Sequence, residues 1–370
     1  MFNRVLFFWK IGLYGLVLSS MNWFMYHQGM PEIMTWYVLP LFMVMPFFFS
    51  LSYNAVHDVS VRTEKVFAWL GGFWFIFTLY SAMASFFCGF VYALLQLAAP
   101  ALWTSYGSSL IRLLFLAVLL LMAYGIFHAL HPKIRTIRME SGKIQRKITL
   151  AFATDIHLSP IQSRAYARRL VERLNGLSPD LVIFGGDIID AHLDFVLRDG
   201  SYKAFQHIRA PLGTWAVFGN HDFFDGDIKK EAALFHPLRF LAHEQVSPLP
   251  GLVLTGLNDY MHYPSEAVPP CDPSGFNILI DHEPLHIGQA EEKGYDLYLG
   301  GHTHAGQFFP VTFITRRMYV LNYGLHRFRQ MTAYVSSGYG AWGFPFRTGP
   351  CPEILRIELF PAEKETGKEA

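Results

Sequence analysis

Hydrophobic residues are distributed unevenly along the chain, and the pattern changes near residue 131. Before that point lie four apolar stretches, at about 5–25, 33–53, 66–99 and 110–130. Roughly 20 apolar residues in a helix are enough to cross the hydrocarbon core of a bilayer, so each stretch is predicted to be a transmembrane helix. A cleaved signal peptide would explain the first stretch but not the three that follow. We therefore expect a membrane anchor of about four helices over residues 1–131.

The third stretch, residues 66–99, is longer than one upright transmembrane helix requires. No turn-forming polar cluster divides it. One tilted helix that extends beyond the bilayer is therefore favoured over two short helices.

Positive charges in the loops predict how the anchor is oriented. Arg4 precedes the first stretch, and Arg62 and Lys65 lie between the second and the third. A basic run follows the fourth stretch, at Lys133, Arg135, Arg138, Lys143, Arg146 and Lys147. Because Lys and Arg stay on the cytoplasmic side, both ends of the anchor should be cytoplasmic. We read residues 132–147 as a basic linker, either simply solvated or attracted to anionic headgroups.

The composition excludes some classes of protein. The chain has 370 residues, a hydrophobic fraction of 52%, a mean hydropathy of +0.24 and a formal net charge of +1. Nucleic-acid binding normally shows as a strongly basic domain or stripe, so no nucleic-acid partner is expected. The cysteines Cys88, Cys271 and Cys351 are widely spaced and form neither a disulfide framework nor a CxxC metal site.

After the basic run, short apolar segments alternate with amphipathic ones. Strands are predicted at 148–153, 181–184, 214–218, 252–255, 278–280 and 297–299, and a helix at 164–175. This alternation is typical of layered α/β domains. We expect one such domain over residues 148–360, followed by a polar tail at 361–370.

Polar motifs follow five of these strands. They contain Asp155 and His157; Asp187 and Asp190; Asn220, His221 and Asp222; Asp281, His282 and Glu283; and His302 and His304. Functional groups in α/β sheets gather at the carboxyl ends of the strands. Carboxylate, imidazole and amide ligands together favour Mn, Fe or Zn over Mg or Ca. A carboxylate such as Asp187 can bridge two ions, which suits hydrolysis of a phosphoester.

These motifs, in this order, resemble the calcineurin-like metallophosphoesterase superfamily over about residues 148–359. The resemblance implies an α/β fold, a four-layer α-β-β-α sandwich with two divalent metal ions at one edge, Mn being favoured over Fe and Zn. It implies ligand roles for Asp155, His157 and His304 at the first metal, Asp187 as the bridge, and Asn220, His282 and His302 at the second metal. No position of the family pattern is substituted, which favours an active hydrolase over a non-catalytic relative.

His221 is implied to be a catalytic residue rather than a ligand, oriented by Asp222. The residue type at position 221 supports this role, because histidine is the side chain best suited to general acid catalysis near neutral pH. For Asp190 two interpretations stay open, a hydrogen bond to a ligand or a cap on the following helix.

The end of the domain, from Gly306-Gln307 to Trp342-Gly343-Phe344-Pro345, resembles a membrane-associated bacterial branch of the superfamily. Enzymes of that branch are attached to the inner membrane. Some enzymes of the wider superfamily cleave UDP-2,3-diacylglucosamine. We therefore expect a multi-pass protein of the inner (cytoplasmic) membrane, with its catalytic domain in the cytoplasm.

Two further features have alternative interpretations. Arg164 and Arg168 share one face of the helix after the Asp155 loop, where they bind substrate or simply pair with Glu172 in solvent. The segment 308–329 interleaves aromatic and basic residues. It either contacts the bilayer or an acyl chain, or forms an ordinary β-hairpin.

The leading prediction is a membrane-bound hydrolase of a lipid-linked phosphoester or pyrophosphate, such as UDP-2,3-diacylglucosamine. Its partners would then be membrane lipids and an amphiphilic phosphoester. One alternative is a tethered phosphohydrolase of soluble nucleotides or phosphoproteins. The other is a non-catalytic membrane scaffold, which the complete ligand set disfavours.

Overall fold

The structure is a computed structural model that describes residues 59–224 and 227–362. The chain separates into two compact units, residues 1–127 and 128–370, and each is described by itself. The first two predicted membrane helices lie outside the described residues.

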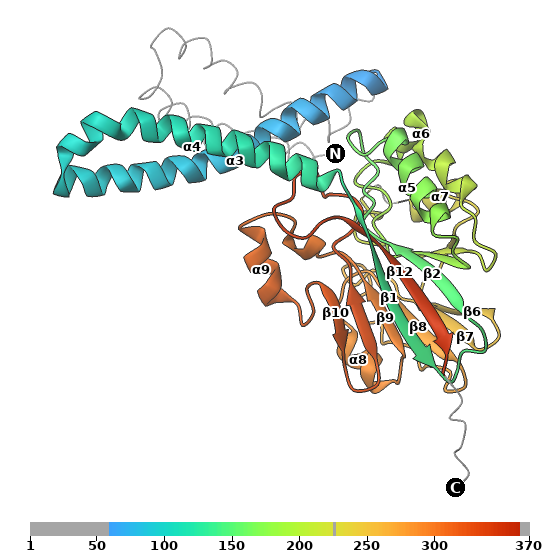
Figure 1. Ribbon diagram of the computed structural model, residues 1–370. Helices are drawn as coiled ribbons and strands as arrows, with labels where there is room; N and C mark the ends of the chain where they lie inside the picture. Colours follow the sequence, from blue (N-terminus) through green and yellow to red (C-terminus); the bar gives the residue numbers. More distant parts are fainter. Residues whose placement is uncertain (1–58, 225–226, 363–370) are drawn as a thin grey trace. The chain divides into compact units, whose positions relative to one another are not determined.

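The described part of the first unit is a pair of long helices, α3 (Val61–Ala98) and α4 (Pro100–Ala129). Ser60 caps α3, and its Oγ accepts a hydrogen bond from the Thr63 backbone N–H at 3.2 Å. The two helices run side by side (Figure 1), with Phe77 packed edge-on against Phe115. Both are long and apolar enough to cross a membrane, with mean hydropathies of 1.6 and 2.5.

The third apolar stretch therefore forms a single helix, as expected. Its 38 residues extend about 57 Å at 1.5 Å per residue, more than the roughly 30 Å of a bilayer core.

The second unit contains two six-stranded sheets. The first has the order β1-β12-β2-β3-β4-β5, formed by β1 (Lys133–Ser141), β2 (Ile148–Ala153), β3 (Leu181–Phe184), β4 (Thr214–Ala216), β5 (Arg239–Phe240) and β12 (Glu353–Pro361). The second has the order β10-β11-β9-β8-β7-β6, formed by β6 (Glu244–Leu249), β7 (Leu252–Gly256), β8 (Phe276–Asp281), β9 (Leu297–Gly300), β10 (Gly324–Arg327) and β11 (Thr332–Val335).

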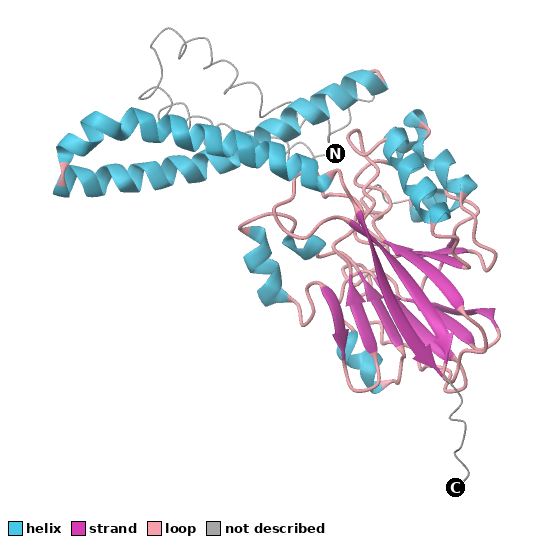
Figure 2. Cartoon of the chain, in the orientation of Figure 1, coloured by secondary structure: helices cyan, strands magenta, loops and turns pink. Residues whose placement is uncertain are grey.

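Helices cover the outer faces of the two sheets (Figure 2). They are α5 (Arg164–Gly176), α6 (Leu193–Asp199), α7 (Ile228–Leu234) and α8 (Ile287–Glu292). The other helical elements are α9 (Val311–Met318) and the 3₁₀ turns η1 (Ser201–His207) and η2 (His304–Gly306). The α-β-β-α sandwich implied by the sequence is confirmed.

Successive side chains of each strand point to opposite faces of the sheet, and this alternation produces the layers. On β2, Leu150 and Phe152 belong to the core between the sheets, where they are joined by Ile280 and Leu299 of the second sheet. The intervening Ala151 and the other small residues of β2 face the opposite way and pack with buried side chains of α5. A second outer core lies between the other sheet and α8. The two sheets and their helices thus fix the strand ends that carry the polar motifs.

The prediction of a basic linker at residues 132–147 is wrong for Lys133–Ser141, which form strand β1. This strand pairs in parallel with β12, from Lys133 opposite Glu353 to Ser141 opposite Pro361. Its cations have acidic partners on β12: Arg135 Nε lies 2.6 Å from Glu353 and Arg138 Nε lies 2.9 Å from Glu358. The sandwich therefore begins before the predicted boundary at residue 148.

The Glu353 carboxylate holds this edge of the first sheet to the second. Its side chain is fully buried and accepts hydrogen bonds from the hydroxyls of Tyr334, Tyr323 and Ser336 and from the Ser337 backbone N–H. Because these donors and Arg135 all converge on one carboxylate, its loss would leave several polar groups without a partner.

We predict that Glu353→Ala destabilises the catalytic unit by about 3–5 kcal/mol, a fall in Tm of roughly 10 °C. Thermal unfolding of the full chain in detergent would measure it. The matched control is Glu244→Ala, at an exposed position on edge strand β6, which should change Tm little. Equal shifts in the two variants would contradict this role for Glu353.

Candidate metal centre

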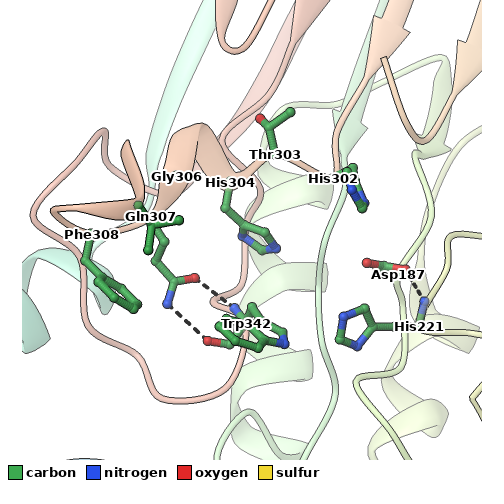
Figure 3. Close-up of a pocket in the computed structure, with 10 residues that line it drawn as sticks. Asp187, His221, His302, Thr303, His304, Gly306, Gln307, Phe308 and Trp342 are labelled. Carbon is green, nitrogen blue, oxygen red and sulfur yellow. Dashed lines mark hydrogen bonds between the residues drawn. The ribbon is translucent and has the colours of Figure 1, made fainter. Parts of the chain in front are cut away.

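Five loops meet at one edge of the sandwich. They follow β2, β3 and β4, which are parallel neighbours in the first sheet, and β8 and β9, which are parallel neighbours in the second. Since parallel strands end at the same edge, their loops bring the polar motifs together. Figure 3 shows several of these side chains around one pocket.

The first group of ligand atoms comes from Asp155, His157 and His304. His157 Nε2 lies 2.9 Å from His304 Nε2, and His304 Nε2 lies 3.3 Å from Asp155 Oδ1. All three side chains are buried, two of them completely. Three metal-ligating atoms from two sheets thus converge on one point.

The second group comes from Asp187, His282 and His302. Asp187 Oδ2 lies 3.2 Å from His282 Nε2 and 3.8 Å from His157 Nε2. Asn220 adds an amide oxygen, with its Oδ1 2.8 Å from His302 Nδ1. Asp187 is therefore common to the two sides of the site, in the position of a bridging ligand.

The hydrogen bonding of His282 tests whether this site suits a cation. Its Nδ1 lies 2.7 Å from the Gly185 carbonyl oxygen, which can only accept, so Nδ1 carries the proton. In the neutral ring, Nε2 then presents a lone pair to the Asp187 carboxylate, and this buried atom has no hydrogen bond within the described residues. Burial alone would lower the pKa of His282, but the charge of Asp187 raises it well above its usual range, so without a cation a second proton lies between Nε2 and the carboxylate. The same position, between a carboxylate and an imidazole lone pair, suits a divalent cation that displaces this proton.

The backbone of the site is unusual. Five of the predicted ligands are non-glycine residues with positive φ: Asp155 (54°), His157 (51°), Asp187 (53°), His302 (65°) and His304 (47°). Such conformations cost on the order of 1 kcal/mol each and persist only where the surroundings enforce them. Their concentration at one sheet edge marks a functional site.

Close packing also requires glycine next to the ligands. A Cβ on Gly219 would lie 2.2 Å from Asp187 Oδ1 and 2.7 Å from His282 Nε2. One on Gly301 would lie 2.5 Å from Asp155 Oδ2. No larger residue fits at either position without moving a ligand.

His221 lies beside the ligands, and its partner is Asp190. His221 Nδ1 contacts the Asp190 carbonyl oxygen and lies 3.3 Å from its Oδ1. Asp190 Oδ1 also lies 3.0 Å from His157 Nδ1. Of the two open interpretations of Asp190, the structure favours the one that places it beside a predicted ligand, His157. Helix capping is wrong, because α6 begins after His192.

The prediction that Asp222 orients His221 is wrong. Asp222 instead accepts hydrogen bonds from the backbone N–H groups of Asp187, Ile189 and Gly219 at 2.8–3.1 Å. The Asp222 carboxylate thus points into the protein and links the loop after β3 to the loop after β4. Asp222 therefore shapes the loop of the bridging residue.

The shifts in pKa of His221 and Asp187 assign different roles to these two side chains. Burial alone would lower the pKa of His221, but the charges of Asp187 and Asp190 raise it to about 9. Burial alone would raise the pKa of Asp187, but His282 and His221 hold it well below its usual range. His221 is thus favoured as a protonated acid, and Asp187 as an ionised ligand.

Arg347 is a residue of the site that sequence reasoning missed. Its fully buried guanidinium donates to the Ser337 and Gly340 carbonyl oxygens at 2.6 Å, and its Nη2 lies 3.2 Å from His304 Nδ1. Burial, with the charges of His157 and Arg347, lowers the pKa of His304 well below its usual range. His304 is thereby kept neutral. The only sequence signal was an arginine inside an apolar segment.

A pocket of about 210 Å³ opens from the cluster (Figure 3). Figure 3 shows Asp187, His221 and His302 on one side of the pocket and Phe308 on the other, with His304 and Trp342 between them, and Val311 also lines it. Gln307 holds the Trp342 loop: its Nε2 donates to the Trp342 carbonyl oxygen at 3.0 Å and its Oε1 accepts from the Trp342 N–H at 2.9 Å. The pocket thus joins a polar, metal-ligating end to an apolar end.

The structure brings together the seven predicted ligands and His221, but not the two predicted substrate-binding arginines. Arg164 and Arg168 are exposed on α5 and do not line this pocket. The segment 308–329 is only partly a hairpin: β10 pairs with β11, but the first half of the segment forms α9.

Comparisons with known proteins agree with this geometry. Residues 148–306 match the family described as calcineurin-like phosphoesterase. An uncharacterized metallophosphoesterase of Helicobacter pylori is 30% identical over 264 residues, covering 67% of this chain and 69% of the relative. A zebrafish (Danio rerio) transmembrane protein with a metallophosphoesterase domain is 31% identical over 280 residues, covering 69% of this chain and 63% of the relative.

Among solved structures, GAP50, the anchor in the inner membrane complex of Plasmodium, matches with 11% identity and a TM-score of 0.33. The match covers 53% of this chain and 73% of that one. A likeness this low carries no argument about function.

Proposed function

The chain belongs to the calcineurin-like metallophosphoesterase family and is a metal-dependent phosphohydrolase, and from this premise we propose that it cleaves a lipid-linked phosphoester or pyrophosphate at a membrane. The observation that carries the proposal is the pocket, which runs from the metal ligands to the apolar side chains of Phe308, Val311 and Trp342.

We propose two divalent ions, Mn²⁺ in preference to Fe or Zn, because the ligands mix carboxylate, imidazole and amide groups. Asp155, His157 and His304 would hold one ion, Asn220, His282 and His302 the other, and Asp187 would bridge them. When bound, such a pair lowers the pKa of a shared water molecule and neutralises charge on the phosphate.

His221 is proposed as the general acid. Because its Nδ1 is held by Asp190, Nε2 is the nitrogen that remains for the substrate. A proton on Nε2 would pass to the oxygen of the leaving group, and the contact of Nδ1 with Asp190 orients the ring for this transfer.

The electrostatics of the site favour the apolar end of the pocket for the rest of the substrate. On the side of His302, the Glu283 carboxylate lies 3.9 Å from the imidazole. Burial and the neighbouring Asp259 raise the pKa of Glu283 to about 7. A carboxyl that is partly ionised near neutral pH offers an anionic substrate group no attraction, whereas an acyl chain suits contact with Phe308, Val311 and Trp342.

The membrane supports the same substrate class. Helices α3 and α4 are long and apolar enough to span a bilayer, and a relative is named as a transmembrane protein. We propose a multi-pass protein of the inner membrane whose catalytic unit faces the cytoplasm and acts on an amphiphile such as UDP-2,3-diacylglucosamine. A tethered enzyme for soluble phosphoesters is the second candidate, and the polar end of the pocket alone would serve it.

Two substitutions test the metal mechanism. Asp187→Ala should abolish hydrolysis and lose bound metal, because it removes the ligand common to both groups. His221→Ala should keep its metal but lower kcat by roughly 10²–10⁴-fold. Metal content by elemental analysis and turnover of a chromogenic phosphoester would be measured on the same preparations. Loss of metal from the His221 variant, or full activity of the Asp187 variant, would contradict the assignment.

A second test concerns the acyl chains. For the full chain in detergent, kcat/KM should be at least about tenfold higher for a diacylated substrate than for its deacylated analogue, since roughly 1.4 kcal/mol of apolar contact suffices. Trp342→Ala should reduce this ratio, because Gln307 binds only the backbone of Trp342 and the loop should stay in place.

The matched control for Trp342→Ala is Leu197→Ala, at an exposed apolar position on α6, which should leave the ratio unchanged. Equal kcat/KM for the two substrates would refute the lipid substrate but leave the metal mechanism standing.

A third test concerns orientation and follows from the positions of Lys and Arg. A reporter fused after Ala370 should show cytoplasmic activity, with the chain recovered in the inner membrane fraction. Activity outside the cytoplasm would show that the number of membrane crossings before residue 128 differs from the prediction.

A further inference from the structure

Helix α9 carries an apolar surface that the fold leaves exposed. None of its residues is buried. Phe313 is 55% exposed, Ile314 56% and Met318 64%, and Val320 just beyond the helix is 84% exposed. Large apolar side chains exposed side by side mark an interaction site more often than chance.

The two faces of α9 differ. Thr312 and Thr315 form the inner face and lie against Gly306, where a Cβ would come within 2.7 Å of both residues. Ile314 and Met318 are four residues apart and share the outer face. The Arg317 guanidinium lies over the Phe313 ring, 6.0 Å from its centroid, so the cation and the apolar surface are adjacent.

The chain segment that contains α9 carries charge of a single sign. Between Asp296 and Glu353 the sequence contains no acidic residue, but it contains Arg316 and Arg317. Within the described residues, neither of these arginines forms an ion pair with a carboxylate. A surface that combines exposed aliphatic and aromatic groups with unpaired arginines is complementary to an anionic lipid interface.

We propose that the outer face of α9 docks on the surface of an anionic lipid bilayer, independently of which phosphoester is the substrate. Phe313, Ile314 and Met318 would enter the boundary between headgroups and acyl chains, while Arg316 and Arg317 bind lipid phosphates. A second copy of the chain fits less well, because a two-fold interface would place the same arginines against each other.

Docking there has a consequence for the pocket. Phe308 and Val311, at the start of α9, line the apolar end of the pocket at the metal ligands. A bilayer against the outer face of this helix would place that end of the pocket at the lipid surface.

The test uses the full chain in nanodiscs that contain phosphatidylglycerol. The photoreactive residue p-benzoylphenylalanine replaces Phe313 in one sample and Leu197 in the control; Leu197 is exposed on α6, which covers the other sheet. After irradiation, mass spectrometry should find lipid adducts at position 313 and few at position 197. Adducts at 313 should decrease in nanodiscs of phosphatidylcholine alone, because the arginines lose their anionic partners.

A double variant, Ile314→Asp with Met318→Asp, should lower the adducts at position 313 to the level of the control position. Its hydrolysis of a soluble chromogenic phosphoester should stay unchanged, because neither residue lines the pocket. Equal adducts at 313 and 197, crosslinks from 313 to a second copy of the chain, or adducts that survive the double substitution would each overturn the proposal.

Discussion

The Asp187 carboxylate and its backbone connect the loops of the site. Oδ1 accepts a hydrogen bond from the His221 N–H at 2.8 Å, and Oδ2 lies 3.2 Å from His282 Nε2. Its carbonyl oxygen accepts from the N–H groups of Ile156 and His157, and its own N–H donates to Asp222. One residue thus joins the loops after β2, β4 and β8, across both sheets. The same side chain that would bridge two cations also fixes the relative positions of the groups around them.

Arranging the ligands in this way has an energetic cost. Five ligands adopt left-handed backbone conformations, and several buried donors and acceptors face like groups. The core between the sheets offsets that cost, because β2, β3, β8 and β9 are almost completely buried. Metal binding would add to the stability of the same loops, since the ligand groups then gain a partner of opposite charge. The buried strands therefore provide the stability that allows the ligand loops to keep their strained conformations.

The parts predicted from sequence are those encoded locally. Asp155 and Asp187 each follow a short apolar run, so the strand and the motif were visible together. The sequence does not predict β1, because its partner β12 lies more than two hundred residues further along the chain. Without that partner, its arginines fit a linker that is solvated or attracted to anionic headgroups. The partner of His221 was misassigned to the adjacent Asp222, whereas the loop brings Asp190 from another strand to the ring.

Pairing of β1 with β12 also determines where the catalytic unit begins. Helix α4 ends at Ala129 and β1 begins at Lys133. The Pro132 carbonyl oxygen between them is held by Arg173 at 2.7 Å. The sheet of the catalytic unit therefore begins within a few residues of the end of α4. With its helices in a bilayer, the enzyme would meet the lipid-linked substrate proposed above by lateral diffusion in two dimensions. Its rate would then follow the surface density of substrate in the membrane rather than the bulk concentration.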